Sequence, residues 1–539
     1  MVTEFPSREA CVLADILDRQ AVTRPGKVCL RLPDAAWTYA EAARRAWRFG
    51  NALHREGIRP GECVSVWVPT RSELLQAWFG INAAGAVYAP LNLASRGMFL
   101  QHALRIAGAR ILVAHGGLLD RLAGLDVPAL ETIVVVGDAP ADLELPWRVV
   151  TFEAFLEGAG DQRPAPVVPT EPWDDFALVY TSGTTGPSKG VRLAYASHHL
   201  YADNLLWDDV GATDTFHMTL PLSHVAGTST TYGMLQRGGT VVLPGQFNPR
   251  TFWAEVREHG CTLTFVIHAM ILFLLDQPEQ PDDADNPLRY AYVGPLTRVE
   301  EFSRRFGLQI YTGFGMTEVP LALRSELNPR NEQTCGRPFR SGYEARLVDE
   351  HDLPVPQGTP GELVIRHDLP WVMNSGYKDM PEATAQAWRN GWFHTGDQLV
   401  VDEGGDWIFL DRTKDAIRRR GENISSYEVE AEVLSHPDVA QVAAIAVPNP
   451  DVDAATDDEE VKVVVVAVEG RDVDPRELVE YLIPRMPRHM VPRFIEVVRE
   501  LPQTPSFKVQ KAKLREAGIT PATWDREAAG IRLARERLA

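Results

Sequence analysis

The stretch Tyr180–Leu193, YTSGTTGPSKGVRL, joins two runs that have apolar, strand-like patterns. Gly183 and Gly186 allow the backbone between those runs to turn its N–H groups inward. Lys189 adds a cation. The hydroxyl donors are Thr181, Ser182, Thr184 and Thr185. Together these groups suit a polyphosphate, in a spacing that is not the Walker pattern because Gly190 follows the lysine. The alternative interpretation is a polar hairpin loop that binds no ligand.

Helical and strand-like patterns alternate on the N-terminal side of this stretch. Residues 38–57 have helical periodicity, residues 63–69 (CVSVWVP) indicate a buried strand, and residues 72–86 indicate the next helix. Residues 110–115 and 132–137 are short apolar strands. This rhythm predicts mostly parallel sheets that are covered by helices, which is an α/β fold.

The pattern changes toward the C-terminus. Residues 361–366 and 396–412 suggest a smaller β-rich unit. Beyond it, four runs predict a compact helix–strand–strand–helix module, at residues 425–439, 441–448, 461–468 and 474–487. We therefore place a domain boundary near Asp411–Lys414, with one domain over residues 1–411 and a second over 412–539. The acidic run at 451–460 is expected to be a solvated loop.

Composition limits the classes of function. A chain of 539 residues is too long for one hydrophobic core, and its net charge of −19 argues against nucleic-acid or anionic-membrane binding. The five cysteines are scattered, which predicts neither a disulfide framework nor a zinc site. No signal peptide is evident, and no apolar run approaches the ~20 residues of a spanning helix. We expect a cytoplasmic enzyme without integral membrane association.

Five motifs carry a family resemblance. YTSGTTGPSKGV resembles the phosphate-loop signature of the adenylate-forming superfamily, which includes acyl-CoA synthetases, nonribosomal adenylation domains and luciferase-like enzymes. Four further segments resemble the other motifs of that superfamily in the same order: YTGFGMTE (311–318), GWFHTGD (391–397), LDRTKDAIRRRGENISSYEVE (410–430) and LPQTPSFKVQKAKLR (501–515). The last two look most like carnitine/crotonobetaine-type and medium-chain acyl-CoA ligases.

This resemblance implies an ATP-dependent acid–thiol ligase. Such an enzyme converts a carboxylate and ATP into an acyl-AMP and pyrophosphate, and then transfers the acyl group to coenzyme A. The implied cofactors and co-substrates are ATP, Mg²⁺ and coenzyme A. The implied architecture is a large N-terminal domain of layered, parallel-rich sheets with a β-rich subdomain, followed by a small mobile C-terminal α+β domain.

The resemblance also assigns residues to ATP. Thr184 and Glu318 would position Mg²⁺, Asp397 would accept hydrogen bonds from the ribose hydroxyls, and Lys508 would bridge the carboxylate and the α-phosphate. Lys511 and Lys513 are nearby alternatives for that lysine. The implied ATP-binding residues are Thr181, Ser182, Gly183, Thr184, Thr185, Gly186, Lys189, Gly294, Pro295, Phe314, Gly315, Met316, Thr317, Asp397, Arg412 and Lys508.

The acid and acceptor sites are assigned in the same way. His224 would be a catalytic residue beside the acid pocket and the thiol tunnel. The implied acid pocket comprises His224, Val225, Gly227, Thr228, Val293, Gly313 and Gly315, whose glycines would leave space for a bulky aliphatic, cyclic or aryl acid. No aspartate is evident in these segments to hold an α-amino group, which disfavours an amino-acid substrate. Lys414 would be the hinge. The implied coenzyme A residues are Arg419, Gly421, Glu422 and Asn423. The alternative interpretation is that the basic run Arg418–Arg420 is a solvated surface that binds no ligand.

Two other functions remain open at this stage. A stand-alone enzyme that loads a carrier-protein phosphopantetheine would use the same first step. A catalytically silent nucleotide sensor would be expected to lack some of Lys189, Glu318, Asp397 and Lys508, and all four are present. The expected partners are therefore small molecules, with a carrier protein as the possible exception.

Overall fold

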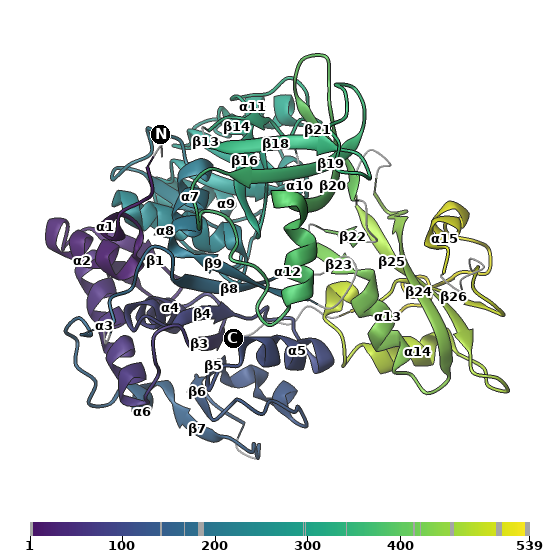
Figure 1. Ribbon diagram of the computed structural model, residues 1–539, viewed down its shortest axis with the longest axis horizontal. Coiled ribbons are helices and arrows are strands. Elements are labelled where there is room, and N and C mark those ends of the chain that lie inside the picture. Colours follow the sequence, from purple (N-terminus) through teal and green to yellow (C-terminus); the bar gives the residue numbers. More distant parts are fainter. Residues whose placement is uncertain are drawn as a thin grey trace.

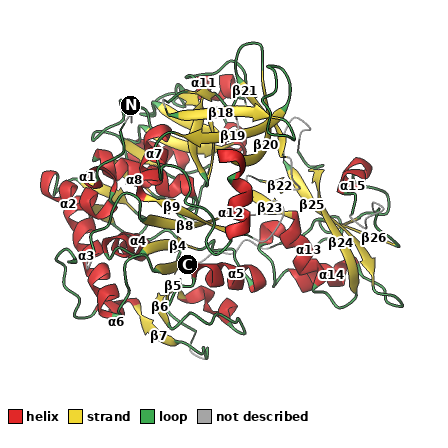
Figure 2. Cartoon of the chain, in the orientation of Figure 1, coloured by secondary structure: helices red, strands yellow, loops and turns green. Residues whose placement is uncertain are grey.

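The computed structural model places a large α/β body beside a smaller C-terminal unit (Figure 1). It describes residues 4–140, 143–165, 168–181, 188–294, 296, 298–340, 342–412, 416–420, 422–452, 458–502 and 509–533. Figure 2 shows strands in the centre of the large body and helices around them. The predicted α/β class, with a large N-terminal and a small C-terminal domain, is confirmed.

One seven-stranded sheet carries the stretch Tyr180–Leu193. Its strand order is β7-β6-β5-β3-β4-β8-β9, and every pair is parallel except β8 with β9. The register of that antiparallel pair sets Thr181 opposite Lys189. The strands are β3 (Cys63–Trp67), β4 (Val87–Pro90), β5 (Ile111–His115), β6 (Thr132–Val136), β7 (Arg148–Thr151), β8 (Asp175–Thr181) and β9 (Lys189–Ala194).

A second seven-stranded sheet has the order β14-β13-β12-β10-β11-β1-β2 and is parallel except at β2. Its strands are short and apolar, as expected where helices cover both faces. They are β1 (Val28–Arg31), β2 (Ala36–Thr38), β10 (Thr215–His217), β11 (Thr240–Val242), β12 (Leu263–Ile267), β13 (Tyr290–Gly294) and β14 (Gln309–Tyr311).

Helices pack around and between these sheets. The start of α3 is set by a capping box, in which Thr38 and Glu41 satisfy each other's backbone N–H groups. Rings of Trp78 and Tyr88 stack at 5.3 Å in the core that joins the helices to both sheets. The helices are α1 (Arg8–Cys11), α2 (Leu13–Thr23), α3 (Tyr39–Arg55), α4 (Ser72–Ala83), α5 (Gly97–Ala107), α6 (Phe152–Leu156), α7 (Tyr195–Leu205), α8 (Val225–Arg237), α9 (Phe252–Glu258), α10 (His268–Leu275) and α11 (Val299–Phe306).

Two antiparallel sheets form the β-rich part of the large body. Strands β15, β16 and β17 form one, and β18 to β21 form the other. The register of β20 with β21 sets Asp397 opposite Arg412. The elements are β15 (Gly313–Met316), β16 (Val319–Arg324), β17 (Arg337–Pro338), β18 (Tyr343–Val348), β19 (Gly361–His367), α12 (Pro381–Ala387), β20 (Phe393–Val401) and β21 (Trp407–Arg412).

The C-terminal unit contains the predicted helix–strand–strand–helix order, as α13, β24, β25 and α14. One expectation about it is wrong, because the acidic run does not stay in a solvated loop throughout. Glu459 begins β25, and Glu460 is fully buried on that strand. The elements are β22 (Ala416–Arg419), β23 (Glu422–Ser425), α13 (Ser426–Leu434), β24 (Val439–Pro448), β25 (Glu459–Ala467), α14 (Pro475–Leu482), the 3₁₀ turn η3 (Arg488–Met490), β26 (Phe494–Val498), α15 (Lys511–Ala517) and β27 (Trp524–Asp525).

None of the helices within the described ranges has both the length and the apolar character needed to cross a bilayer.

Candidate active site

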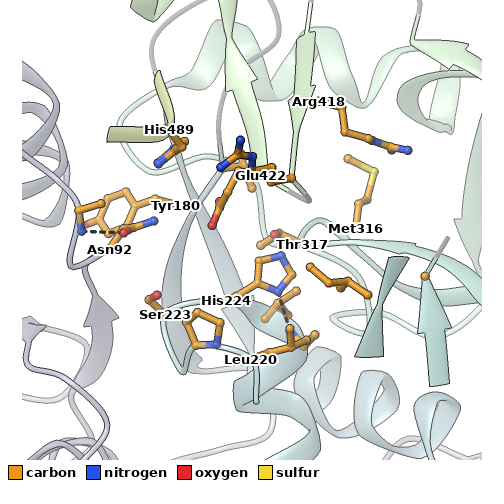
Figure 3. Close-up of a pocket in the computed structure, with 18 of the residues that line it drawn as sticks. Asn92, Tyr180, Leu220, Ser223, His224, Met316, Thr317, Arg418, Glu422 and His489 are labelled. Atoms are coloured by element: carbon orange, nitrogen blue, oxygen red, sulfur yellow. Dashed lines mark hydrogen bonds between the residues drawn. The ribbon is translucent and has the colours of Figure 1, made fainter. Parts of the chain in front are cut away.

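A cavity of about 2940 Å³ lies between the large body and the C-terminal unit. Its lining comes from segments that are far apart in the chain, including the ends of β8 and β9, strand β15, the start of α8 and the β22–β23 hairpin. Figure 3 shows side chains from these segments converging, among them His224, Thr317 and Glu422. Most of the described residues that we predicted for ATP, acid and acceptor therefore border one space.

At the edge of the cavity where we predicted the phosphates, Tyr377 contacts both Lys189 and Glu318. The Nζ of Lys189 lies 4.4 Å from the centre of the Tyr377 ring. The Tyr377 hydroxyl donates a hydrogen bond of 3.0 Å to Oε1 of Glu318, a residue that is only 4% exposed. Burial, and then the Glu318 carboxylate, raise the pKa of Tyr377 well above its usual range, so this hydroxyl stays a donor. One tyrosine thus contacts both groups, the cation through its ring and the carboxylate through its hydroxyl.

Several predicted residues cannot be placed in this site. Arg412 and Asn423 are placed by their backbone register alone, opposite Asp397 and Arg418. Those that lie outside the described residues are Ser182, Gly183, Thr184, Thr185, Gly186, Pro295, Lys414, Gly421 and Lys508.

Apart from Arg412, the predicted nucleoside contacts that the structure describes line the cavity. Asp397 is 2% exposed on β20, and Phe314 is 8% exposed on β15. A methyl group at Gly315 would lie 3.2 Å from Cα of Leu321, so β16 approaches this glycine closely. The lining residues of this set are Gly294, Phe314, Gly315, Met316, Thr317 and Asp397.

The structure corrects part of the predicted acid pocket. His224, Val225, Gly313 and Gly315 line the cavity, whereas three other predicted residues do not. Those three are Gly227, Thr228 and Val293.

Packing explains this difference. A Cβ at Gly227 would lie 2.4 Å from the carbonyl oxygen of Pro221, so the glycine admits a neighbouring backbone and leaves no space for substrate. The hydroxyl of Thr228 donates to the carbonyl of Val225 at 3.0 Å within the helix. Val293 is fully buried in the core. These residues shape α8 and β13 rather than the cavity surface.

His224 caps the N-terminus of α8 and faces the cavity. Its Nδ1 accepts a hydrogen bond of 3.2 Å from the backbone N–H of Ala226, so the proton of the neutral ring lies on Nε2. The surrounding protein lowers the pKa of His224, and the carboxylate of Glu422 acts in the opposite direction. His224 therefore offers an N–H donor to a bound ligand near neutral pH.

Arg419 has a different place from the one predicted. Its guanidinium is 5% exposed and pairs at 2.6 Å with the buried carboxylate of Glu460, and it donates to the carbonyl of His489 at 2.8 Å. It does not line the cavity, whereas its neighbours Arg418 and Arg420 do. The prediction that Arg419 contacts coenzyme A is therefore corrected, because ion pairing and carbonyl contacts turn this side chain into the C-terminal unit.

The structure adds a contact between the two parts of the molecule that sequence reasoning missed. The backbone N–H of Ser188 donates to Oε1 of Glu428 on α13 at 2.9 Å, and the serine hydroxyl also contacts that oxygen. Burial raises the pKa of Glu428. The two residues are 240 positions apart, so no local pattern could have joined them.

The two alternative lysines lie away from the cavity. Lys511 pairs with Glu430 at 2.7 Å and donates to the hydroxyl of Ser426 at 2.8 Å. Neither Lys511 nor Lys513 lines the cavity. In this arrangement the hairpin that carries Glu422 faces the site, and the described part of the lysine segment does not.

Comparison with known proteins identifies the family. A family model described as "AMP-binding enzyme" matches residues 17–377. The chain belongs to the AMP-binding enzyme family. A second model, "AMP-binding enzyme C-terminal domain", matches residues 428–508. The predicted membership of the adenylate-forming superfamily is confirmed.

Relatives of this AMP-binding enzyme match it along most of their length. A sulfoacetate–CoA ligase of Cupriavidus necator is 32% identical over 93% of this chain and 97% of its own. A crotonobetaine/carnitine–CoA ligase of Salmonella paratyphi A is 29% identical over 89% and 93%. The solved amide bond synthetase of Marinactinospora thermotolerans superimposes with a TM-score of 0.77 at 26% identity, over 93% of this chain and 99% of its own. The names of the two ligases agree with the predicted class, an AMP-forming acyl-CoA synthetase.

Proposed function

We propose that this AMP-binding enzyme activates a hydrophobic carboxylic acid as an acyl-AMP and transfers the acyl group to coenzyme A. One observation carries the proposal: a single cavity is lined by Lys189 and Glu318, by Asp397, and by His224 and Glu422. These residues supply a phosphate-side cation and carboxylate, a ribose-side carboxylate, and polar groups where acid and thiol would meet. The ligase names of the relatives support the same reaction class.

In the first step a carboxylate oxygen attacks the α-phosphorus of ATP, and pyrophosphate leaves with the electron pair of the broken P–O bond. Two anions meet, so the enzyme's main task is to neutralise charge and align the reactants. Lys189 and the hydroxyl-rich loop would hold the β- and γ-phosphates, and Lys508 would bridge carboxylate and α-phosphate.

Glu318 fits a magnesium site. Magnesium keeps most of its waters and needs only one or two protein oxygens. Glu318 is a buried carboxylate that opens into the cavity, and Tyr377 orients it. Glu318 and Thr184 would hold the ion, whose charge would neutralise the phosphate oxygens of ATP.

The walls near His224 favour an apolar acid without an amino group. In the segments 219–226, 265–270 and 292–296, none of the described side chains that line the cavity is acidic. An α-ammonium group would therefore find no carboxylate in these three segments. The apolar and aromatic residues that line this part are Leu220, Phe265, Ile267, Met270, Tyr292 and Leu296.

The test is a pyrophosphate-release assay on a panel of aliphatic, cyclic, aryl and amino acids. Three acceptor conditions accompany it: coenzyme A, a phosphopantetheinylated carrier protein, and no thiol. We expect AMP and pyrophosphate from a hydrophobic acid, with thioester formed on coenzyme A. Stoichiometric ADP would contradict adenylation, efficient use of an amino acid would contradict the pocket assignment, and thioester on the carrier protein alone would favour the carrier-loading enzyme.

Lys508 separates the two half-reactions. If it bridges carboxylate and α-phosphate, Lys508→Ala should slow acyl-AMP formation by roughly 100-fold or more, the scale for losing a key electrostatic contact. Thioester formation from synthetic acyl-AMP should persist, because that step begins after the α-phosphate has reacted. Equal losses in both assays would show that the lysine is wrongly assigned.

A further inference from the structure

The second step of the proposed reaction releases a proton that some group must accept. A free thiol has a pKa of about 8.5, so near neutral pH most of it is protonated and a poor nucleophile. The proton must leave as sulfur bonds to the acyl carbon. Among the protein groups, the carboxylates and imidazoles that line the cavity are candidate acceptors, and their hydrogen bonds distinguish them.

The carboxylates nearest the β22–β23 hairpin are already engaged, except one. Glu428 accepts from Ser188, and Glu459 accepts from the backbone N–H of Arg418 at 2.7 Å. Asp458 accepts from the backbone N–H of Arg420 at 2.5 Å. The other lining carboxylates that have partners are Asp34, Glu318, Glu332, Glu362 and Asp397.

Glu422 is the remaining lining carboxylate. Among the residues that the structure describes, none forms a hydrogen bond or ion pair with its side chain, which is exposed to the cavity. Figure 3 shows Glu422 between His489 and His224, and its charge influences the titration of both imidazoles. Its carboxylate is thus free to bind a ligand group at the entrance to the acid pocket.

Three imidazoles line the cavity, those of His224, His394 and His489. The ring of His394 is hydrogen-bonded through Nδ1 to Glu362 at 3.1 Å. Nδ1 of His224 already accepts from Ala226, which leaves an N–H donor on the other nitrogen. Burial lowers the pKa of His489, and the variant His489→Gln described below tests that ring directly. His224 is better placed to donate to the acyl oxygen than to take a proton from the thiol.

The hairpin positions Glu422 firmly. Glu422 begins β23 directly opposite Arg419 on β22. Arg419 is held by Glu460 and by the carbonyls of His489 and Val491, at 2.8 and 3.3 Å. This buried network fixes the strand that precedes the turn. The residue that we had assigned to coenzyme A therefore serves to position its neighbour across the hairpin.

We propose that Glu422 accepts the proton of the acceptor thiol as the thiol attacks the acyl adenylate. This rests on the proposed function. The S–C bond forms while the S–H proton passes to the carboxylate, the acyl C–O bond then breaks, and AMP leaves with its electron pair. The protonated Glu422 later returns the proton to solvent. An ordinary glutamate is about four pKa units more acidic than a thiol, so transfer accompanies attack, when the sulfur proton is most acidic.

The experiment compares full-length wild type with Glu422→Gln, which keeps shape and removes the base. Synthetic acyl-AMP of the best acid from the panel is mixed with coenzyme A, and single-turnover thioester formation is followed from pH 6 to 9. We expect a loss of roughly 100-fold at pH 6.5. The rate of the variant should then rise about tenfold per pH unit until the thiol ionises by itself, while the KM for coenzyme A changes little.

Other charged groups around Glu422 could also change the pH dependence of thioester formation, so the experiment needs control variants. These groups are Arg418 and Arg420 beside the hairpin turn, Arg488 and His489 on η3, and His224 at α8. His489→Gln should keep the shallow profile of wild type. Glu480→Gln, an exposed carboxylate on α14, is the matched control and should be unchanged.

The outcomes are distinct. A profile for Glu422→Gln parallel to that of wild type would overturn the proposal, as would a steepened profile in His489→Gln alone. Pyrophosphate release by the variant checks that it is folded. If wild type releases pyrophosphate and forms no coenzyme A thioester, the proposed function itself is wrong, and Glu422 has no thiol to deprotonate.

Discussion

Tyr377 links the two charged residues on the side of the cavity where we propose that the phosphates bind. Its ring lies under Lys189 and its hydroxyl holds Glu318, so one residue orients both groups that would bind the phosphates and the magnesium ion. The hydroxyl is a lasting donor because burial and the nearby carboxylate raise the pKa of Tyr377. Glu318 and Tyr377 are 59 positions apart, and neither local pattern indicates the other.

Tyr377→Phe tests this arrangement, since it keeps the ring and removes the hydroxyl. Losing a hydrogen bond to a charged group costs about 1.5–3 kcal/mol, so kcat/KM for ATP in acid-dependent adenylation should fall by roughly 10- to 100-fold. Tyr377→Leu should lose more, because the contact with Lys189 goes too. Unchanged ATP kinetics in the phenylalanine variant would show that the hydroxyl does not orient the carboxylate that we propose as the metal ligand.

At the scale of elements, the β22–β23 hairpin depends on a buried ion pair. Arg419 and Glu460 are 5% and 0% exposed at their side chains and lie 2.6 Å apart. Burial raises the pKa of Glu460 even though Arg419 opposes the change. Each buried charge is therefore stabilised by the other, and the ion pair connects the hairpin to strand β25.

Arg419→Leu should destabilise the C-terminal unit by about 3–5 kcal/mol, because it leaves an uncompensated buried carboxylate. The measurement is denaturant unfolding of the whole protein, with Arg499→Leu as the control, since Arg420 also approaches Glu460 at 3.9 Å. Arg499 is exposed, so its loss should change stability by less than ~0.5 kcal/mol. Normal stability of Arg419→Leu, with a raised KM for coenzyme A, would restore the original assignment of Arg419 to the acceptor.

At the scale of the whole molecule, the contact between Ser188 and Glu428 joins the C-terminal unit to the residue that precedes strand β9. The carboxylate is buried in this arrangement, which raises the pKa of Glu428 above its usual value. If the two domains separate, the same group returns to water and its ordinary pKa. Protonation therefore favours the docked arrangement, and docking weakens as pH rises through the raised pKa.

We expect the docked population to grow as pH falls from 8 to 5, by at most tenfold per pH unit because one proton is involved. Distance distributions between one spectroscopic label on each domain would measure this population. Glu428→Gln keeps an acceptor for Ser188 without a titrating group, so its docked population should not respond to pH over this range. The same response in both proteins would assign the effect to another group.

The two proposed half-reactions would also require two domain orientations. The hairpin with Glu422 faces the cavity here, whereas Lys511 and Lys513 do not line it. Bringing Lys508 to the α-phosphate would then need rotation of the C-terminal unit about a few residues. The predicted hinge is Lys414, between the end of β21 at Arg412 and the start of β22 at Ala416.

Lys414→Pro should keep much of the acyl-AMP-forming rate and lose most thioester formation, because proline fixes φ and removes an N–H. Both half-reactions are measured on one preparation, with Lys414→Ala as the control for loss of the side chain. A folded proline variant with normal thioester synthesis would refute the hinge assignment. Loss of adenylation alone would mean that the substitution had trapped the other orientation.

The sequence by itself determined the α/β class, the order of the motifs and the helix–strand–strand–helix module, because periodicity and turn chemistry lie in contiguous residues. It also indicated the residues Asp397, Glu318 and Lys189, since their motifs resemble those of a family that the comparisons confirm. The ligand roles of these residues stay predictions, as do the assignments within 182–186 and at Lys508.

Only the tertiary structure decided which of the indicated side chains face the cavity. Arg419 and Glu422 lie three positions apart in one basic and polar run, yet the first is buried against Glu460 and the second borders the site. The motif around Gly227 predicted an acid pocket, but the carbonyl of Pro221 occupies the space beside this glycine. Burial and ion pairing depend on tertiary contacts between segments that are far apart in the chain. A local sequence pattern does not specify those contacts.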